Sequence, residues 1–498
     1  MTALLGSVLG YRFTLPLVQL DRGIAYRGAS TRLRHVVSRL LAGREVKVGV
    51  VGGSISWGHG SEKRGVDDWF SVLSNWLFEA FPRSNVTARN GCVPGVTSAY
   101  MILCMERSVD PESELVFVEF TLNDGPREQL MNNDVVQDME RLVRRLLALP
   151  RRPAVVIFHT PTHGLANYPR GHPKNPEGDE YVPFYQTTED AQGAVAHYYD
   201  VQALSLRTAL YRLAQHQPKA GFRWEDTMYD IHPGQQGHRI MADLAVHLLQ
   251  QTALGLVLRP WSTQEEEAFE EPLPPPMYEG NAAPDAPMCL MQGAFIALVP
   301  PESLSGFNYT VEGTPEKPKP GYIATVAGAS MRVRLDTHRD GSDALVRLYW
   351  QHLKSYEKMG TAEFSCVSGC KCVALRVDGT HARKASQIYL GVHDVSQAKE
   401  CVIEVKVLSE TTAPEGPLRH KFKLTGVVAS ERPGGSIFDN IVAGGGPFAV
   451  REHNGERSQT TLSREGLQGG WKEDEAELQE HFRQEEERLK AAAAAAGR

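Results

Sequence analysis

The sequence lacks long hydrophobic runs and has no excess of positive charge. No stretch approaches the roughly 18 consecutive apolar residues of a transmembrane helix, so no membrane span is expected. The 53 Lys and Arg stand against 60 Asp and Glu, a formal net charge of −7. Neither nucleic acid nor an anionic membrane surface is therefore an expected partner. Residues 1–23 also lack a basic leader, so this start does not read as a signal peptide.

Cysteine is sparse in the first half of the chain, which holds only Cys92 and Cys104. The others follow residue 280: Cys289, Cys366, Cys370, Cys372 and Cys401. The x3 and x1 spacings within 366–372 differ from the x2 spacing of zinc knuckles, so a metal site is not favoured and no cofactor is expected. One or two disulfides among the five are expected if the protein enters the secretory pathway. The location is otherwise open, with the secretory pathway or the cell exterior favoured over the cytoplasm.

What the sequence does contain is an ordinary globular composition, 42% hydrophobic and 23% charged over 498 residues. From about residue 46 to 255, short apolar runs alternate with amphipathic helical patterns, which predicts an α/β domain with a parallel sheet. The expected strands are Val46–Val51, Leu115–Thr121 and Ala154–His159, and the expected helices are Arg127–Leu149 and Gln235–Leu254.

The pattern changes after a segment of glutamates and prolines at 261–288, which we interpret as a linker. Alternation of period two then predicts an antiparallel β-sandwich or jelly roll over 289–432, with strands at Met331–Leu335, Ile403–Val407 and Phe422–Leu424. Three remaining segments complete the domain assignment. They are an N-terminal extension at 1–45 before the α/β domain at 46–260, an irregular loop at 162–190, and a tail at 433–498 with a charged helix near 471–496.

Four short motifs follow expected strands of the α/β domain. Ser54 stands on a Gly-Gly-Ser turn directly after the first strand, where such folds expose nucleophiles, with Ser56 as the less well placed alternative. Gly95 lies in a glycine loop whose backbone can approach a ligand. Asn123 ends a buried strand, and its amide could donate to a developing oxyanion. His232 precedes a proline at the start of the last helix.

In this order the motifs resemble the marker residues of the SGNH, or GDSL-type, hydrolase superfamily. The resemblance rests on Gly52 to Ile55, on Asn90 to Ser98, on Asn123-Asp124 and on His232 to His238, within the first domain. It implies a flavodoxin-like three-layer α/β/α fold and a serine esterase. Residues 319–328 and 352–380 look like the C-terminal β-domain of a plant and green-algal type of SGNH protein.

By this resemblance, Ser54 is the nucleophile and His232 the general base. The backbone N–H groups of Ser54 and Gly95 and the amide of Asn123 would form the oxyanion hole. Two positions depart from the family pattern: Gly53 replaces the Asp of GDSL, and Tyr229 stands where the family places its acid, three residues before the histidine.

The triad acid is therefore open. Asp230, two positions before the histidine, is our expected acid, in preference to Asp226, and a Ser–His dyad without an acid is the third alternative. Other histidines are less informative: His159 and His163 could line the cleft, and His59 and His238 receive no role.

The leading hypothesis is an esterase that removes small, acetyl-like acyl groups, from a small-molecule or carbohydrate ester. An O-acyltransferase using the same acyl-enzyme and a non-catalytic glycan-binding protein are the alternatives. Exposed aromatics such as Tyr349, Trp350 and Tyr356 would suit sugar stacking, although strand aromatics are more often core. Oligomeric state cannot be inferred from the sequence.

Overall fold

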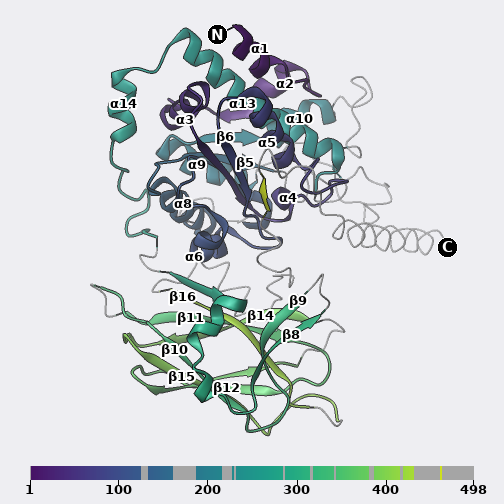
Figure 1. The fold of residues 1–498 in the computed structure, drawn as a ribbon, viewed down its shortest axis with the longest axis vertical. Coiled ribbons are helices and arrows are strands. Elements are labelled where there is room, and N and C mark those ends of the chain that lie inside the picture. The colour runs from purple at the N-terminus through teal and green to yellow at the C-terminus, as the bar shows by residue number, and fades with distance from the viewer. Residues whose placement is uncertain are drawn as a thin grey trace, which may run out of the picture. The chain divides into compact units, whose positions relative to one another are not determined.

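The computed structural model describes residues 2–124, 133–160, 187–215, 227–228, 232–283, 287–313, 318–340, 344–380, 386–415, 419–430 and 460–462. The chain divides into two compact units (Figure 1). Unit 1 comprises Met1–Ser98, Ser108–Asn281 and Ser458–Arg498, and unit 2 comprises Ala99–Arg107 and Ala282–Arg457. A short piece of the first half of the sequence thus belongs to the second unit.

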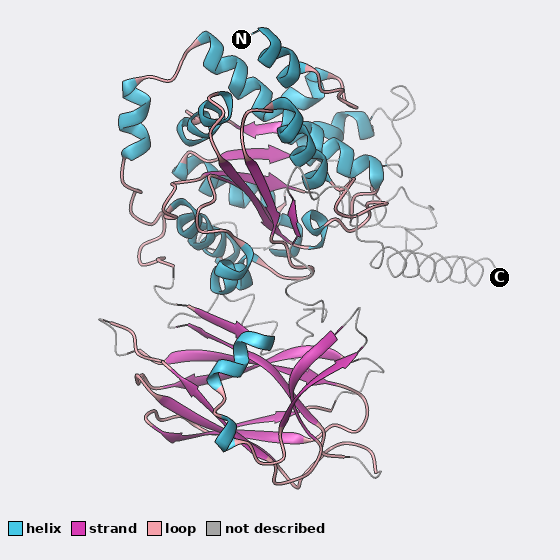
Figure 2. Ribbon diagram, viewed as in Figure 1, coloured by secondary structure: helices cyan, strands magenta, loops and turns pink. Residues whose placement is uncertain are grey.

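Unit 1 is built on a seven-stranded sheet of order β1-β6-β5-β4-β2-β3-β17. The strands from β6 to β3 pair in parallel, whereas β1 and β17 pair antiparallel at the two edges (Figure 2). The bounds are β1 Ile24–Tyr26, β2 Val46–Gly52, β3 Val86–Asn90, β4 Leu115–Glu119, β5 Ala154–His159, β6 Gln202–Ser205 and β17 Thr460–Leu462. The expected strands and the parallel α/β class are confirmed.

Helices of unit 1 cover both faces of this sheet, and the bounds below also include α6, most of which belongs to unit 2. Their bounds are α1 Thr2–Leu9, α2 Leu17–Gly23, α3 Thr31–Leu41, α4 Ser54–Trp57, α5 Trp69–Ala80, α6 Ser98–Ser108, α7 Thr121–Asp124, α8 Asp134–Leu147, α9 Thr188–Tyr199, α10 Leu206–Gln215, α13 Gln235–Leu258 and α14 Thr263–Glu270. Alternate residues of β4, Leu115 and Phe117, pack in one core with α3, α5 and α13. The helices α8 and α9 contact β5 and β6. Burial of both sheet faces explains why the strands read as continuous apolar runs.

Helix α13 is, among the described residues, the one helix long and apolar enough in composition to cross a membrane. In unit 1, however, 72% of its most apolar window is buried, and side chains such as Leu244 and Leu248 lie in the core. Such burial is that of a core helix, which accounts for its composition.

Unit 2 consists of two antiparallel sheets, as expected from the period-two pattern. One has the order β10-β15-β12-β13, and the other β14-β11-β16-β9-β8 with β7 paired to β16. The bounds are β7 Met288–Met291, β8 Asn308–Gly313, β9 Pro318–Ala324, β10 Ser330–Leu335, β11 Val346–Lys354, β12 Thr361–Ser368, β13 Leu375–Asp378, β14 Gln387–Val395, β15 Cys401–Val407 and β16 Phe422–Ser430, with 3-10 helices at Gln292–Leu298 and Pro301–Ser303. Tyr349 and Trp350 are fully buried, so neither is free for sugar stacking, while Tyr356 is 39% exposed.

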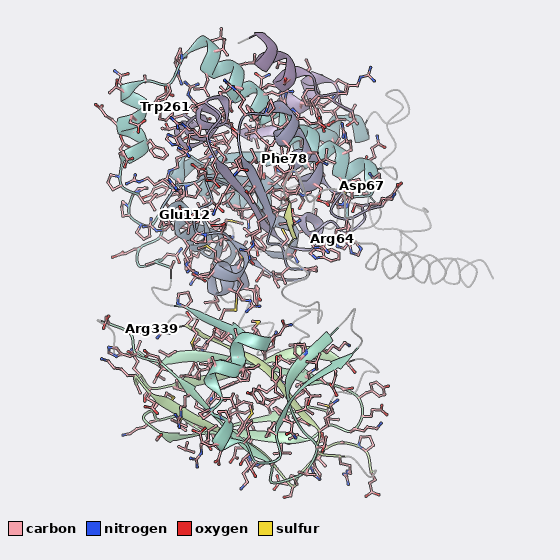
Figure 3. The ribbon with its side chains drawn as sticks, in the orientation of Figure 1. Arg64, Asp67, Phe78, Glu112, Trp261 and Arg339 are labelled. Atoms are coloured by element: carbon pink, nitrogen blue, oxygen red, sulfur yellow. A yellow bond between two sulfur atoms is a disulfide. The ribbon has the colours of Figure 1, made fainter. Side chains whose placement is uncertain are left out.

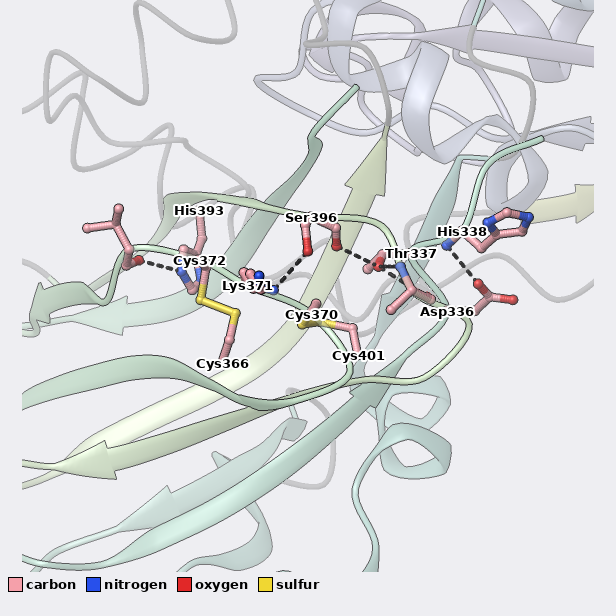
Figure 4. The surroundings of a disulfide bond; sticks show 12 residues. Asp336, Thr337, His338, Cys366, Cys370, Lys371, Cys372, His393, Ser396 and Cys401 are labelled. Carbon is pink, nitrogen blue, oxygen red and sulfur yellow. Dashed lines mark hydrogen bonds between the residues drawn. A yellow bond between two sulfur atoms is a disulfide. The ribbon is translucent and has the colours of Figure 1, made fainter. Parts of the chain in front are cut away.

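Six of the seven cysteines form disulfides, all within unit 2. Cys366–Cys372 and Cys370–Cys401 lie side by side at one end of the sandwich (Figure 4), two pairs within the set that the sequence singled out. Cys104 of α6 is joined to Cys289 of β7. The sequence did not predict this third bond, since pairing across 185 positions cannot be deduced from spacing. Three disulfides are typical of a secreted or extracellular protein.

The segment 261–288, which we expected to be a linker, begins with a helix, α14, rather than with an extended chain. Ser262 caps α14, accepting a hydrogen bond from the N–H of Glu265, and the Glu265 carboxylate pairs with Arg34 of α3. Phe269 stacks on His35 with ring centroids 4.0 Å apart, next to the Trp261 labelled in Figure 3. Residues 162–186 of the predicted loop, and the predicted helix at 471–496, lie outside the described residues.

Candidate active site

Ser54, the candidate nucleophile, lies at the junction between β2 and α4. Gly53 is the N-cap of α4, its N–H donates to the carbonyl of Glu119 at 3.2 Å, and Ser54 is the first helical residue. The Oγ of Ser54 lies 2.8 Å from Nε2 of His232, although the two residues are 178 positions apart. The structure thus brings together a hydroxyl and a potential general base at hydrogen-bond distance.

Ser56, the alternative nucleophile, points the other way. Its side chain is fully buried, and its hydroxyl accepts a hydrogen bond from Nε1 of Trp69 at 3.1 Å. A hydroxyl already satisfied in the core cannot meet a substrate, so the alternative is not supported.

The loop that carries His232 is held in place by two glycines. The carbonyl oxygen of Pro233 would lie 2.1 Å from a Cβ added at Gly60, whose φ is +90°. On the other side, the carbonyl oxygen of Thr227 would lie 2.2 Å from a Cβ added at Gly237. Only glycine permits these approaches, so both residues help to set the position of the imidazole.

Two further histidines lie beside His232. The ring of His59 lies against the ring of His232 with centroids 4.1 Å apart and planes tilted by 35°. His238 is fully buried, its Nε2 lies 2.9 Å from the carbonyl oxygen of His59, and burial lowers its pKa. Since His238 anchors the backbone of His59, both contribute to the surroundings of His232. Sequence reasoning gave them no role, although His238 ends the motif that begins at His232.

Asn123 packs directly over the nucleophile turn. A Cβ added at Gly53 would lie 2.1 to 3.0 Å from the atoms of the Asn123 amide group. The amide therefore occupies the space that a side chain at position 53 would need. A side chain at this position, such as the aspartate of the GDSL pattern, would displace the amide.

Gly95 is exposed in the loop between β3 and α6, with a φ of +77°. The loop is fixed at its start by Val93, whose N–H donates to the carbonyl of Gly52 at 3.0 Å. The buried side chain of Asn90 donates to the carbonyl of Ser56 at 2.8 Å, which joins the same strand end to the nucleophile turn. Ser54, Gly95 and Asn123 are thus carried by three adjacent strand ends, those of β2, β3 and β4.

Asp230 and Asp226, the expected acid and its alternative, both lie outside the described residues, as does His163. The choice of acid stays a prediction.

Sequence reasoning missed two buried carboxyl groups beside Asn123. Glu119 is fully buried, and burial raises its pKa to about 7. Asp124 is 2% exposed, and burial raises its pKa to about 8. The signal was present in the segment 119–124, where two acidic residues flank the predicted oxyanion donor at the end of an apolar strand.

His159 belongs to the same buried layer and does not line an open cleft. It is 1% exposed, its Nδ1 lies 3.0 Å from the hydroxyl of Thr121, and burial lowers its pKa to about 3. Thr121 also donates to Gln192 of α9 at 3.2 Å. The neutral imidazole is part of the support behind α7.

Among the described residues, the groups of side chains that could hold a metal ion both lie in unit 2. The sulfurs of Cys366 and Cys372 lie near a nitrogen of His393, and the sulfur of Cys366 also lies near those of Cys370 and Cys401. All four sulfurs are in disulfides, and both ring nitrogens of His393 have partners, Trp350 and Val373. The cluster as drawn in Figure 4 is covalent cross-linking rather than a set of open metal ligands.

Part of unit 1 resembles a known protein family. Residues 50–240 match the model of the GDSL-like Lipase/Acylhydrolase family, a range that contains Ser54, Gly95, Asn123 and His232. None of the curated proteins matches the chain.

Solved structures extend the likeness to both units. A two-domain esterase active on acetylated mannans is 19% identical, with a TM-score of 0.56, over 83% of this chain and 99% of the other. A structure of a two-domain esterase active on acetylated mannans, co-crystallised with mannopentaose, has the same identity and score over 85% of this chain. At this identity the likeness concerns the fold. Residues 50–240 therefore resemble the GDSL-like lipase/acylhydrolase family, and a second, antiparallel β domain follows them. The plant and green-algal type finds no support in these matches.

Proposed function

We propose that this protein is a serine esterase that removes small, acetyl-like acyl groups through an acyl-enzyme on Ser54. The observation that carries the proposal is the 2.8 Å approach of the Ser54 hydroxyl to Nε2 of His232. A serine hydroxyl is a weak nucleophile until an adjacent base takes its proton, and this pair supplies both.

In the acylation step, Oγ of Ser54 attacks the ester carbonyl carbon while its proton passes to Nε2 of His232. The tetrahedral intermediate collapses as the imidazolium returns that proton to the leaving alkoxide, which departs as an alcohol. Water then attacks the acyl-enzyme with the same imidazole as base, so acid and free Ser54 are regenerated.

The oxyanion would be stabilised by the N–H groups of Ser54 and Gly95 and by the amide of Asn123. Loss of one such donor costs about 10²- to 10³-fold in kcat in enzymes of this kind. The packing of Asn123 over Gly53 supports its place in this set. Asp230 is our expected partner for the second nitrogen of His232.

For the alcohol part of the substrate we propose a carbohydrate. The support is the fold shared over 83% of the chain with a two-domain esterase active on acetylated mannans. The three disulfides support a site of action in the secretory pathway or outside the cell.

The test is labelling of the full chain with a fluorophosphonate probe, comparing the parent with Ser54→Ala. We expect labelling of the parent and loss of the label in Ser54→Ala. The matched control is Ser56→Ala, which removes a nearby hydroxyl that is buried and should retain the label.

Absence of a Ser54-dependent label in folded protein would overturn the esterase and leave a glycan-binding role. For a labelled parent, acetate release from acetylated mannan oligosaccharides is then measured. Transfer of the acyl group to an added acceptor sugar, rather than release of acetate, would indicate an acyltransferase.

A further inference from the structure

We propose that Glu119 and Asp124 are positioning residues that hold the backbone donors of the oxyanion hole in register with the amide of Asn123. The inference rests on the proposed function, because it assigns these carboxyl groups to the same reaction. It adds two residues that act through others and do not touch the substrate.

Glu119 fixes the nucleophile side. Its Oε2 accepts a hydrogen bond from the N–H of Ser56 at 3.3 Å, and its Oε1 accepts one from the hydroxyl of Thr160 at 2.9 Å. Its main-chain carbonyl also accepts from Gly53 at 3.2 Å. The residues on both sides of Ser54 are thereby tied to the end of β4, which constrains the direction of the Ser54 N–H.

Asp124 fixes the Gly95 side. Its Oδ1 accepts a hydrogen bond from the N–H of Ser98 at 2.8 Å, three residues after Gly95. Its Oδ2 accepts from Nε2 of Gln192 on α9 at 2.8 Å, which holds the carboxyl group itself in place. Asp124 directly follows Asn123. The same short segment therefore carries the side-chain amide of the oxyanion hole and the carboxyl group that holds the Gly95 loop.

The burial of these groups argues that their placement is specific. A carboxyl group removed from water is costly unless it is hydrogen-bonded, and each of these two makes side-chain hydrogen bonds through both oxygens. Both sets of bonds reach the loops that follow β2 and β3. A residue that only filled the core at the end of β4 could be apolar, like Phe120 beside it.

A matched control is available in Asp243 of α13. It is also fully buried, and it accepts hydrogen bonds from the N–H of Thr14 at 2.6 Å and the hydroxyl of Tyr11 at 2.9 Å. None of these partners belongs to the nucleophile turn or to the Gly95 loop. Asp243→Ala therefore reports the general cost of removing a buried, hydrogen-bonded carboxyl group from unit 1.

The experiment measures kcat and KM with 4-nitrophenyl acetate, and thermal unfolding separately, for Glu119→Ala, Asp124→Ala and Asp243→Ala. The rate of Ser54→Ala is the Ser54-independent background and is subtracted. An oxyanion hole stabilises the transition state more than the bound ester, so we expect kcat to fall about 10- to 100-fold in the first two variants, with KM within about twofold. Glu119→Gln and Asp124→Asn keep an acceptor oxygen and should restore most of kcat. If Asp124→Ala does not fold, Gln192→Ala replaces it, with an expected fall of about three- to tenfold.

The outcomes separate this inference from the function on which it rests. If the parent has no Ser54-dependent turnover, the proposed function fails and the inference fails with it. If the parent turns over but the folded alanine variants keep kcat within twofold, the inference alone is overturned. An equal loss of kcat in Asp243→Ala, or no rescue by Gln and Asn, would also overturn it, because the effect would then be one of stability.

Discussion

The two units differ in the chemistry of their buried residues. Unit 2 contains all three disulfides, whereas the single cysteine of unit 1, Cys92, is a buried free thiol. Among the described residues, the carboxyl groups whose pKa is raised all lie in unit 1, and Glu119 and Asp124 are the most strongly shifted of them. In the described part of unit 2, the one shifted carboxyl group is Glu312, whose pKa is lowered by Lys421 and Lys423 despite the opposing effect of burial. The contrast teaches that unit 1 should respond to pH and unit 2 to reductant.

The largest expected effect is a loss of turnover from a substitution in unit 1 that leaves unit 2 folded. His232→Ala should lower acyl-ester turnover about 10⁴- to 10⁶-fold, because the Ser54 hydroxyl loses its base. The control His197→Ala changes a histidine that packs on Tyr26 and should leave turnover unchanged. Calorimetry should show an unaltered unfolding transition of unit 2, and a shifted one would contradict the separation of the units.

Removing a disulfide should change the stability of unit 2 and leave turnover unchanged. The double substitution of Cys370 and Cys401 by Ser should destabilise unit 2 by about 2–5 kcal/mol, measured by urea unfolding. Turnover should stay within twofold of the parent. Cys92→Ala, which removes the free thiol of unit 1, is the control that should leave the unit 2 transition in place. Equal loss in both units would refute the contrast.

The pH dependence should belong to unit 1. Burial raises the pKa of Glu119 from 4.5 to about 7, so the folded state binds its proton more tightly than the unfolded state. Its stabilisation is present below about pH 4.5 and is lost as pH rises through about 7, a change of about 3 kcal/mol at 1.4 kcal/mol per pKa unit. Unfolding free energies measured from pH 4 to 8 should show this fall in the parent and a flatter curve in Glu119→Gln. The same slope of unfolding free energy against pH in the parent and in Glu119→Gln would contradict this assignment to Glu119.

The smallest expected effect is a loss of stability that tests whether α14 belongs to unit 1. Ser262 caps α14, and Ser262→Ala should cost about 1 kcal/mol. Since α14 packs on α3, the loss should appear in the transition of unit 1. Thr263→Ala, at the next and exposed position, should change stability by less than half as much, and a loss confined to unit 2 would move the boundary.

Much of this architecture could be predicted from local sequence. Runs such as Ala154–His159 are buried on both sides, so their β-branched and aromatic residues identify them as strands. The order Ser54, Gly95, Asn123, His232 was readable because parallel strands end at one edge of their sheet.

The rest depends on contacts between distant segments. The short strand β17 gains its structure by pairing with β3, which no local pattern reveals. The contact between the rings of His59 and His232, and the hydrogen bonds of Glu119, arise only when loops separated along the chain meet. Cys104 gave no sign that it would pair with Cys289 in the second half of the chain.

That last bond also changes how the molecule would bear mechanical load. Cys104–Cys289 closes a covalent ring that contains β4, β5, β6 and α13, with Asn123 and His232 inside it. Tension applied to the two ends of the chain passes through the disulfide and bypasses the ring. Pulling would extend only the residues outside it, and reduction would release a further length of about 600 Å for the 185-residue separation.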